Sequence, residues 1–161
     1  MEVYLVQHGQ ALSDEQSPQR PLSDEGRAAV GKVAVHLSAR LSELIHPPIT
    51  EIRHSGKLRA RQTAEILAQA LCSNVTPAAG ESMGPNDDPR TIHDELTANR
   101  DQPGAIMLVG HLPHLARLAG LLLTGEAGKT PVRFTNAAVL KISPTENAWA
   151  VDWYLTPACV G

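Results

Sequence analysis

The stretch Glu2-Val3-Tyr4-Leu5-Val6 runs directly into Gln7-His8-Gly9, so a short apolar segment near the N-terminus ends in polar residues. A mostly apolar run of this length, bounded by a turn, is typical of a buried β-strand. The glycine permits the tight turn that would leave the His8 imidazole facing a ligand. Taken alone, the pattern fits equally a histidine that caps a strand end through a backbone hydrogen bond.

Similar apolar runs recur along the chain and alternate with segments of helical periodicity. The further predicted strands are Ile49–Arg53, Ala105–Val109, Ala138–Ile142 and Trp149–Tyr154. The predicted helices are Ser23–Ile45, Leu58–Leu71, Pro89–Asn99 and Pro113–Leu123. This alternation predicts an α/β fold with three layers, α/β/α, around a mostly parallel central sheet.

The composition limits the possible functions. The 161 residues suit one domain spanning 1–161, and 42% hydrophobic with 19% charged residues is typical of a globular protein. A net charge of −3 argues against broad electrostatic binding to nucleic acid or an anionic membrane. The sequence shows no signal peptide or membrane span, and its two cysteines make neither a disulfide framework nor a zinc spacing. We therefore expect a cytoplasmic protein.

Polar clusters containing histidine follow three of the predicted strands. Gln7-His8-Gly9 follows the first strand, His54-Ser55 the second, and Gly110-His111 the strand that ends at Val109. Ligands of α/β folds bind at the carboxyl ends of the strands, so three such clusters indicate a functional site. Pro113 would open a helix beside them, and the N-terminus of a helix favours a bound anion.

Two arginines complete a small cationic pocket in this acidic protein. Arg20 lies in a loop just before a predicted helix, and Arg59 lies about one turn into the helix that follows Ser55. Either arginine alone would be read as an ordinary surface charge. Together with His8 and His111 they favour a phosphoryl group, which arginine binds through paired charge-assisted hydrogen bonds.

At this point the sequence resembles the histidine phosphatase superfamily (phosphoglycerate mutase-like), and within it the small SixA-type branch of phosphohistidine phosphatases. The segments that carry the resemblance are Val3–Ala11, Arg20–Ser23, Ser55–Thr63, Val109–Pro113, Gly125-Glu126, Phe134-Thr135 and Trp153–Pro157. They follow one another in order over nearly the whole chain. An ordered set of motifs is far more specific than any one of them.

The resemblance implies a metal-independent phosphatase that passes through a phosphorylated His8. His8 would be the nucleophile, Arg20 and Arg59 would bind phosphate, and His111 would stabilise the transferring group. The superfamily has an arginine where this chain has Gln7, which keeps hydrogen-bond donors but loses the fixed charge. We expect Gln7 to line the phosphate site and to give a rate roughly ten- to a hundredfold lower than arginine would.

Three acidic residues are candidates for the proton donor to the leaving group. Larger members of the superfamily use an acidic side chain in the middle of the chain, and the candidates here are Glu81, Asp87 and Asp88. Glu81 lies nearest the expected place, although solvated loop acids, with Asp88 as a helix cap, explain these residues equally well. His111 and His114 lack the glutamate of a zinc-binding helix, so we expect no metal and no cofactor.

The expected substrate is a protein that carries phosphohistidine, because the short connections leave little chain to cover the pocket. We expect a monomer that binds neither nucleic acid nor membrane, with a role in signal transduction. Two alternatives stay open. One is a broader small-molecule phosphomonoesterase, and the other is a catalytically weakened module that binds phosphate or a phosphoprotein, with Gln7 marking the weakened pocket.

Overall fold

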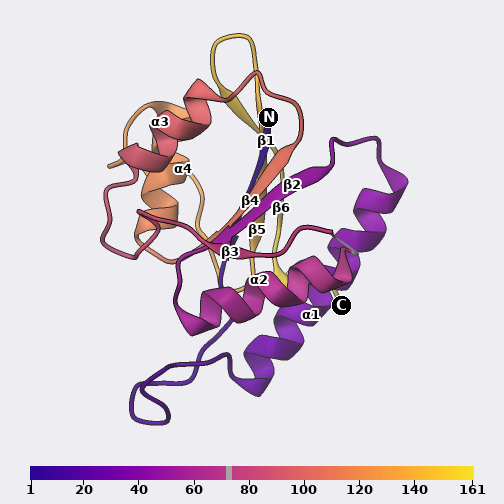
Figure 1. Ribbon diagram of the computed structural model, residues 1–161, viewed down its shortest axis with the longest axis vertical. Coiled ribbons are helices and arrows are strands. Elements are labelled where there is room, and N and C mark those ends of the chain that lie inside the picture. Colours follow the sequence, from indigo (N-terminus) through magenta and orange to yellow (C-terminus); the bar gives the residue numbers. More distant parts are fainter. Residues whose placement is uncertain (72–73) are drawn as a thin grey trace.

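The computed structural model describes residues 1–71 and 74–161, and Figure 1 shows a central sheet with helices on both of its faces. Within these residues the strands are β1 (Glu2–Gln7), β2 (Ile49–His54), β3 (Ala78–Ala79), β4 (Ala105–Gly110), β5 (Val139–Pro144) and β6 (Trp149–Leu155). The helices are α1 (Asp24–Glu43), α2 (Leu58–Ala70), α3 (Arg90–Ala98), α4 (His114–Thr124) and the short 3-10 helix η1 (Pro157–Cys159). Cys72 lies outside the described residues, and Cys159 is exposed with a free thiol.

The strands lie in the order β3-β2-β4-β1-β5-β6. Strands β3, β2, β4 and β1 are parallel, β5 runs antiparallel to β1, and β6 runs antiparallel to β5. In this sheet only β5 therefore opposes the common direction. The predicted α/β class and the mostly parallel sheet are confirmed.

Side chains of β1 alternate between two hydrophobic clusters, one on each face of the sheet. Tyr4 and Val6 pack with buried residues of α1 and α2, whereas Val3 and Leu5 pack with buried residues of α3 and α4. Full burial of an aliphatic side chain of this size stabilises the fold by about 1.5–3 kcal/mol. The apolar run at the N-terminus therefore forms a central strand, with α1 and α2 on one face and α3 and α4 on the other.

The helix ends differ from the predicted ends by one or two residues. Helix α1 begins after Ser23, whose hydroxyl accepts the Gly26 N–H at 3.0 Å as an N-cap, and it ends at Glu43 rather than Ile45. Helices α3 and α4 begin one residue later than predicted, because Pro89 and Pro113 are their N-caps rather than their first helical residues. These differences leave the positions of the candidate site residues unchanged.

The short strand β3 was missed from the sequence, because two residues carry no periodicity to detect. It pairs in parallel with the end of β2, where His54 lies opposite Ala79. This pairing brings the segment that contains Glu81 to the carboxyl edge of the sheet. Among the described residues, no helix is both long and apolar enough to cross a membrane.

Candidate active site

The carboxyl ends of three neighbouring strands bring the predicted polar clusters together. Strand β4 lies between β2 and β1, with Val109 opposite His54 and Gly110 opposite Gln7. Beyond the strands, the backbone N–H of His8 donates to the Gly110 carbonyl at 3.2 Å. The clusters that follow three separate strands thus form one edge of the sheet, as expected for an α/β fold.

The imidazole of His8 is partly buried and is held in one tautomer. Its Nδ1 lies 2.6 Å from the Gly9 carbonyl oxygen, which can only accept, so Nδ1 carries the proton and Nε2 the lone pair. The Nε–H of Arg59 donates to that Nε2 at 3.3 Å. Burial lowers the pKa of His8, and the charges of Arg59 and Arg20 lower it further. Near pH 7 His8 is therefore neutral, and its lone pair faces a cation.

The second pocket histidine, His111, is 2% exposed, and its ring centroid lies 4.7 Å from that of His8. Its Nε2 is hydrogen-bonded to the Ser55 hydroxyl. Burial lowers the pKa of His111 to about 3, and the proximity of His8, Arg59 and Lys57 contributes to this shift. Without a ligand this favours the neutral form of His111, which can donate a hydrogen bond to an oxyanion.

The two predicted arginines reach the site from different elements. Arg59 lies in the first turn of α2, and its pKa is lowered by burial and by the nearby charge of Arg20. Arg20 lies in the loop before α1, where its Nε–H donates to the Leu12 carbonyl at 3.1 Å and lies 3.6 Å from Asp14. Its φ of 48° is uncommon for a residue other than glycine. The structure therefore places both cations at the His8 edge, where Arg20 pairs with Asp14 and Arg59 has no carboxylate within ion-pair distance among the described residues.

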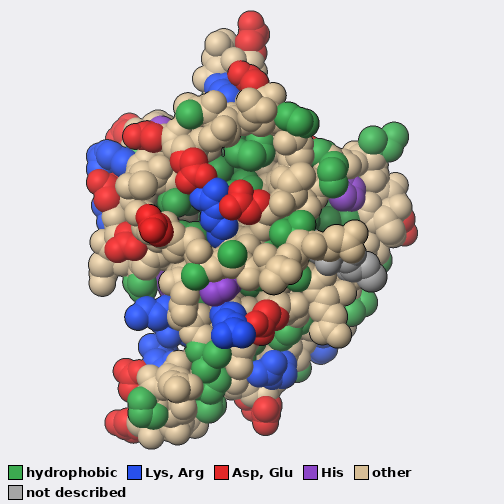
Figure 2. Space-filling model, viewed as in Figure 1, with side chains coloured by type: hydrophobic (Ala, Val, Ile, Leu, Met, Phe, Trp, Pro, Cys, Tyr) green, Lys and Arg blue, Asp and Glu red, His purple; other side chains and the backbone are tan. Residues whose placement is uncertain are grey.

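Figure 2 shows Lys and Arg side chains gathered over the lower part of one face, near α2, in a protein of net charge −3. Local concentration of positive charge in an acidic protein suits a small anion better than an extended polyanion.

Two neighbouring residues of α2 hold the loops that carry these groups. The Gln62 side chain accepts the Leu22 N–H at 2.8 Å, which ties the loop after Arg20 to α2. The Thr63 hydroxyl accepts the Gly9 N–H at 3.0 Å, which ties the loop after His8 to the same helix. Both residues belong to the motif Ser55–Thr63, but no local pattern in the sequence indicates a role for either of them.

Gln7 is 8% exposed, and its Nε2 donates to the Asn136 side chain at 2.8 Å. Asn136 was not predicted, because it lies 129 positions away and no pattern in the sequence links the two residues. The amide that replaces a family arginine is thus occupied by an internal partner. Its part in phosphate binding stays a prediction.

The three candidate proton donors lie in the segment between β3 and α3. Glu81 lines a hollow of about 430 Å³ with Arg53 and Glu95. Asp87 accepts the Gly84 N–H at 2.7 Å, and Asp88 accepts the first amide of α3 at 3.0 Å, as a helix cap does. Within the described chain, none of the three makes a hydrogen bond or ion pair to either pocket histidine. The identity of the proton donor is still a prediction.

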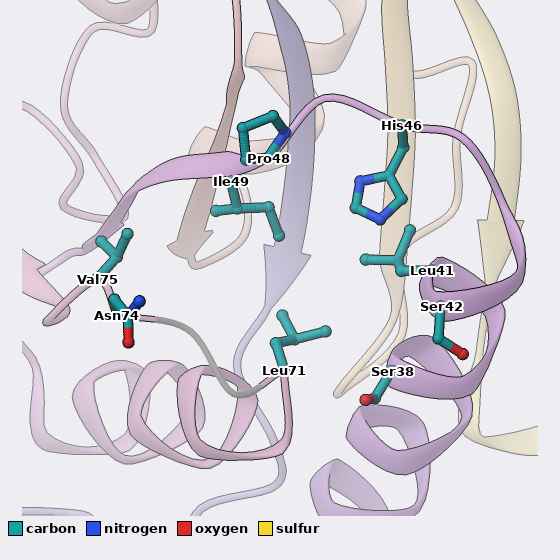
Figure 3. A pocket seen from close by; sticks show the side chains of 9 residues that line it. All are labelled: Ser38, Leu41, Ser42, His46, Pro48, Ile49, Leu71, Asn74 and Val75. Carbon is teal, nitrogen blue, oxygen red and sulfur yellow. The ribbon is translucent and has the colours of Figure 1, made fainter.

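Figure 3 shows a different hollow, of about 530 Å³, between the end of α1, the start of β2 and the segment that follows α2. Its lining residues are Ser38, Leu41, Ser42, His46, Pro48, Ile49, Leu71, Asn74 and Val75. Because Ile49 begins β2 and His54 ends it, this hollow lies at the opposite edge of the sheet. Of its lining residues only His46 is titratable. Size therefore does not locate the site, whereas converging polar side chains do.

Comparison with known proteins agrees with the geometry, although no protein-family model matches the chain. An uncharacterized protein of Picosynechococcus is 33% identical over 133 residues, which span 80% of this chain and 76% of that protein. The structure of the protein histidine phosphatase SixA in complex with tungstate superposes with a TM-score of 0.82 and 25% identity, over 98% of both chains. The chain belongs to the histidine phosphatase superfamily. Within the superfamily it is a member of the SixA-like branch.

The histidine phosphatase fold extends over the whole sheet and not only over the site. Phosphoglycerate mutase of Bacillus anthracis superposes with a TM-score of 0.69 over 99% of this chain and 95% of that protein, at 15% identity. This second likeness shows the fold alone. The likeness to SixA supports a phosphatase of the histidine phosphatase type, in the hydrolase class. In the described part of this histidine phosphatase, no three side chains of His, Cys, Asp or Glu gather to hold a metal ion.

Proposed function

We propose that this histidine phosphatase removes the phosphoryl group from phosphohistidine in proteins, through a covalent phosphohistidine at His8. One observation carries the proposal: the Nε2 lone pair of a neutral His8 lies 3.3 Å from the Arg59 Nε, and the His111 ring lies beside it. A nucleophile already deprotonated near pH 7 and adjacent to a cation suits attack on a dianionic phosphoryl group.

The reaction runs in two displacements at phosphorus. The His8 Nε2 attacks in line, the P–N bond to the substrate histidine breaks, and the departing imidazole takes up a proton from water. Water then attacks the phosphorylated His8, the new P–N bond breaks, and phosphate leaves. Arg59 and Arg20 neutralise charge on the equatorial oxygens, and His111 donates a hydrogen bond to one of them. Holding these groups in place lowers the entropic cost of each step.

Phosphohistidine is proposed as the substrate because its leaving group, an imidazole, suits a site in which, among the described residues, no acid is bonded to the pocket histidines. An imidazole is a better leaving group than an alkoxide, so its departure needs less help from an acid. In the described chain no carboxylate is bonded to either pocket histidine, and Glu81 opens onto a separate hollow with Arg53. The likeness to SixA, itself named a protein histidine phosphatase, supports the same substrate.

A protein substrate is supported by how open the cationic edge is. The Arg20 side chain is partly exposed, and Lys57 and Arg61 beside the site are exposed. A phosphorylated histidine on the surface of a protein could approach these groups without displacing a covering segment.

The test is incubation of the wild type and His8→Ala with a protein phosphorylated on histidine, in excess EDTA. We expect the wild type to release phosphate and the variant to release none, with a labelled His8 trapped in the wild type by rapid quenching. The mechanism is wrong if EDTA stops the reaction or if His8→Ala keeps its activity. Turnover of sugar phosphates and nucleotides at comparable rates would instead support the broader phosphomonoesterase.

A second candidate function is supported by Gln7, whose amide is bonded to Asn136. Without the arginine charge, the pocket could bind phosphate or a phosphoprotein and turn it over poorly. Calorimetry with tungstate and with phosphoprotein separates the two functions. Tight binding without detectable turnover would favour the binding module over the enzyme.

A further inference from the structure

Thr63 joins the loop of one candidate catalytic residue to the backbone of another. It lies on α2, 0% exposed, and its hydroxyl makes two hydrogen bonds. The hydroxyl oxygen accepts the Gly9 N–H at 3.0 Å and donates its proton to the Arg59 carbonyl at 2.8 Å. One buried hydroxyl thus connects the residue after His8 to the residue that faces His8.

Gly9 transmits this contact to the His8 ring. The Gly9 carbonyl accepts the Nδ1–H of His8 at 2.6 Å, and this bond is what leaves the lone pair on Nε2. Gly9 is also closely packed, because an added Cβ would lie 2.6 Å from Val30 Cγ2 and 3.0 Å from the Gly26 oxygen. Helix α1 therefore confines Gly9 on one side, and the Thr63 hydroxyl anchors it to α2 on the other.

We infer that Thr63 is a positioning residue that keeps His8 in its attacking tautomer and in register with Arg59. Thr63 does not reach the substrate and acts through the backbone of Gly9. Without the hydroxyl the Gly9 N–H loses its partner, so the backbone at Gly9 is held only by its packing against α1 and the Nδ1–H bond weakens. The lone pair then spends part of its time on Nδ1, turned away from Arg59. The inference rests on the proposed function only in taking His8 as the nucleophile.

The kinetic test compares Thr63→Val, which keeps the shape and removes the hydroxyl, with Thr63→Ser, which keeps the hydroxyl. We expect kcat of Thr63→Val to fall about ten- to a hundredfold with KM nearly unchanged, since misplaced reacting groups cost rates of this order. Thr63→Ser should stay within about threefold of the wild type. Equal losses in both variants, or none in Thr63→Val, would overturn the inference.

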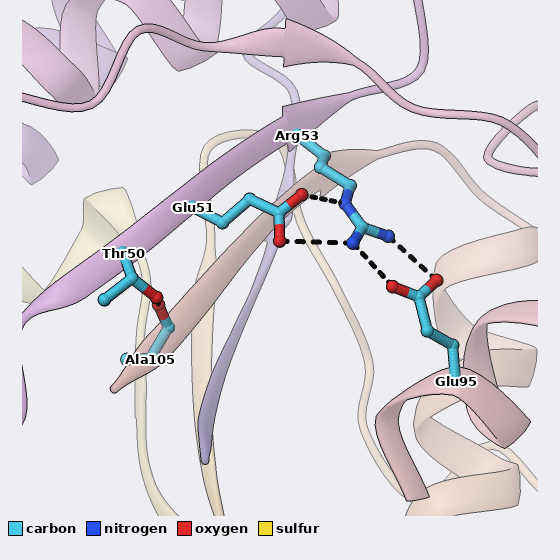
Figure 4. Close-up of polar contacts among 5 residues, drawn as sticks. All are labelled: Thr50, Glu51, Arg53, Glu95 and Ala105. Atoms are coloured by element: carbon cyan, nitrogen blue, oxygen red, sulfur yellow. Dashed lines mark hydrogen bonds and ion pairs between the residues drawn. The ribbon is translucent and has the colours of Figure 1, made fainter. Parts of the chain in front are cut away.

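A control for the loss of a hydroxyl-to-carbonyl bond exists on β2, at the more exposed Thr50. Thr50 also donates its hydroxyl to a backbone carbonyl, that of Ala105, at 3.2 Å, but at the edge of the sheet opposite the site (Figure 4). Thr50→Val should therefore leave kcat unchanged. If it lowers kcat as much as Thr63→Val does, the effect is one of general stability and the positioning role is refuted.

A spectroscopic test does not depend on the substrate. Nitrogen-15 NMR distinguishes the two imidazole tautomers, and the His8 signals are assigned by comparison with His8→Ala. We expect a single Nδ1–H tautomer in the wild type and in Thr63→Ser, and a mixture in Thr63→Val. A single tautomer in all three refutes the inference. If the wild type fails to act on phosphohistidine, the proposed substrate is wrong, and this test still decides the role of Thr63.

The rate of a variant that does not fold says nothing about Thr63, so the melting curve of each variant is recorded. Thr63→Ala, which does not press a methyl group against the Gly9 N–H, replaces Thr63→Val if the latter fails to fold. The same tautomer mixture and loss of kcat are expected from it, and a wild-type spectrum with wild-type kcat would refute the inference.

Discussion

Arg53 and Arg59 lie six positions apart in the sequence, but only Arg53 forms ion pairs with carboxylates among the described residues. The Arg53 guanidinium is held between two carboxylates, with bonds of 2.9 and 2.5 Å to Glu95 and 3.1 Å to Glu51 (Figure 4). Arg59 has no carboxylate within ion-pair distance in the described chain, and its Nε–H points to His8. Glu95 and Glu51 raise the pKa of Arg53, whereas burial and Arg20 lower that of Arg59.

The difference separates a cation that is neutralised inside the protein from one that we propose to bind a ligand. The charge of Arg53 is neutralised by ion pairs inside the protein, and the pair with Glu95 joins β2 to α3. Arg59 keeps its charge uncompensated beside a neutral histidine, which is an arrangement that costs stability and is typical of functional sites. In the sequence Glu51 lies two positions before Arg53, whereas Lys57 and Arg61 flank Arg59. Only the structure shows that Glu95, 42 positions away, completes the neutralisation of Arg53.

The largest expected effect is on activity in Arg59→Ala. Loss of its charge-assisted bonds to the phosphoryl group should lower kcat/KM by about a hundred- to a thousandfold, measured by steady-state phosphate release. The melting temperature should stay near that of the wild type, because the removed charge has no internal partner. Wild-type kinetics in Arg59→Ala would contradict the contrast drawn between the two arginines.

The next effect concerns Gln7→Arg, which would add a further cation directly before His8. We expect kcat/KM to rise roughly ten- to a hundredfold, since a hydrogen bond to a charged group is worth about 1.5–3 kcal/mol. Asn136→Ala, which frees the Gln7 amide without adding charge, is the control. An unchanged rate in Gln7→Arg would show that position 7 does not meet the transferring group.

Arg53→Met tests the structural side of the comparison. Glu51 and Glu95 would then face each other without a cation, and we expect the free energy of unfolding in urea to fall by roughly 1–2 kcal/mol. The estimate is kept small because all three side chains are partly exposed. Turnover should stay within about twofold of the wild type. A loss of activity without a loss of stability would mean that this cluster also serves the reaction.

The smallest effect is on the pH profile. Protonation of His8 removes the attacking lone pair, so kcat/KM should fall as the pH falls through its folded-state pKa, which lies below the usual 6.5. Arg59→Gln removes one charge that lowers this pKa, so the acid limb should move to higher pH. Arg53→Gln should leave the limb in place. A limb that moves equally in both variants would argue against a local effect of Arg59.

Strong local patterns made the main features predictable. Apolar runs before His8 and before His111 are typical of buried parallel strands. Parallel strands place their carboxyl ends at one edge of the sheet. Arg59 was predictable because it lies in the first turn of the helix that follows Ser55. These features depend on residues close in the sequence and on a general rule of topology.

The long-range contacts of the site and the short strand β3 could not be predicted from local sequence patterns. The contact of Asn136 with Gln7 and that of Thr63 with Gly9 join residues 129 and 54 positions apart. The neighbourhood of Glu81 depends on β3, whose two residues have no detectable period. Each of these depends on which segments the completed sheet brings together, and no local pattern records that.

By itself, the sequence of this protein determined the α/β class, the strand ends that carry His8 and His111, and the resemblance that names the superfamily. All of these follow from short-range periodicity and ordered motifs. Only the tertiary structure decided that the charge of Arg53 is neutralised while that of Arg59 is free, and that His8 keeps its lone pair on Nε2. Those outcomes depend on burial and on hydrogen-bond partners, which exist only after distant segments have packed together.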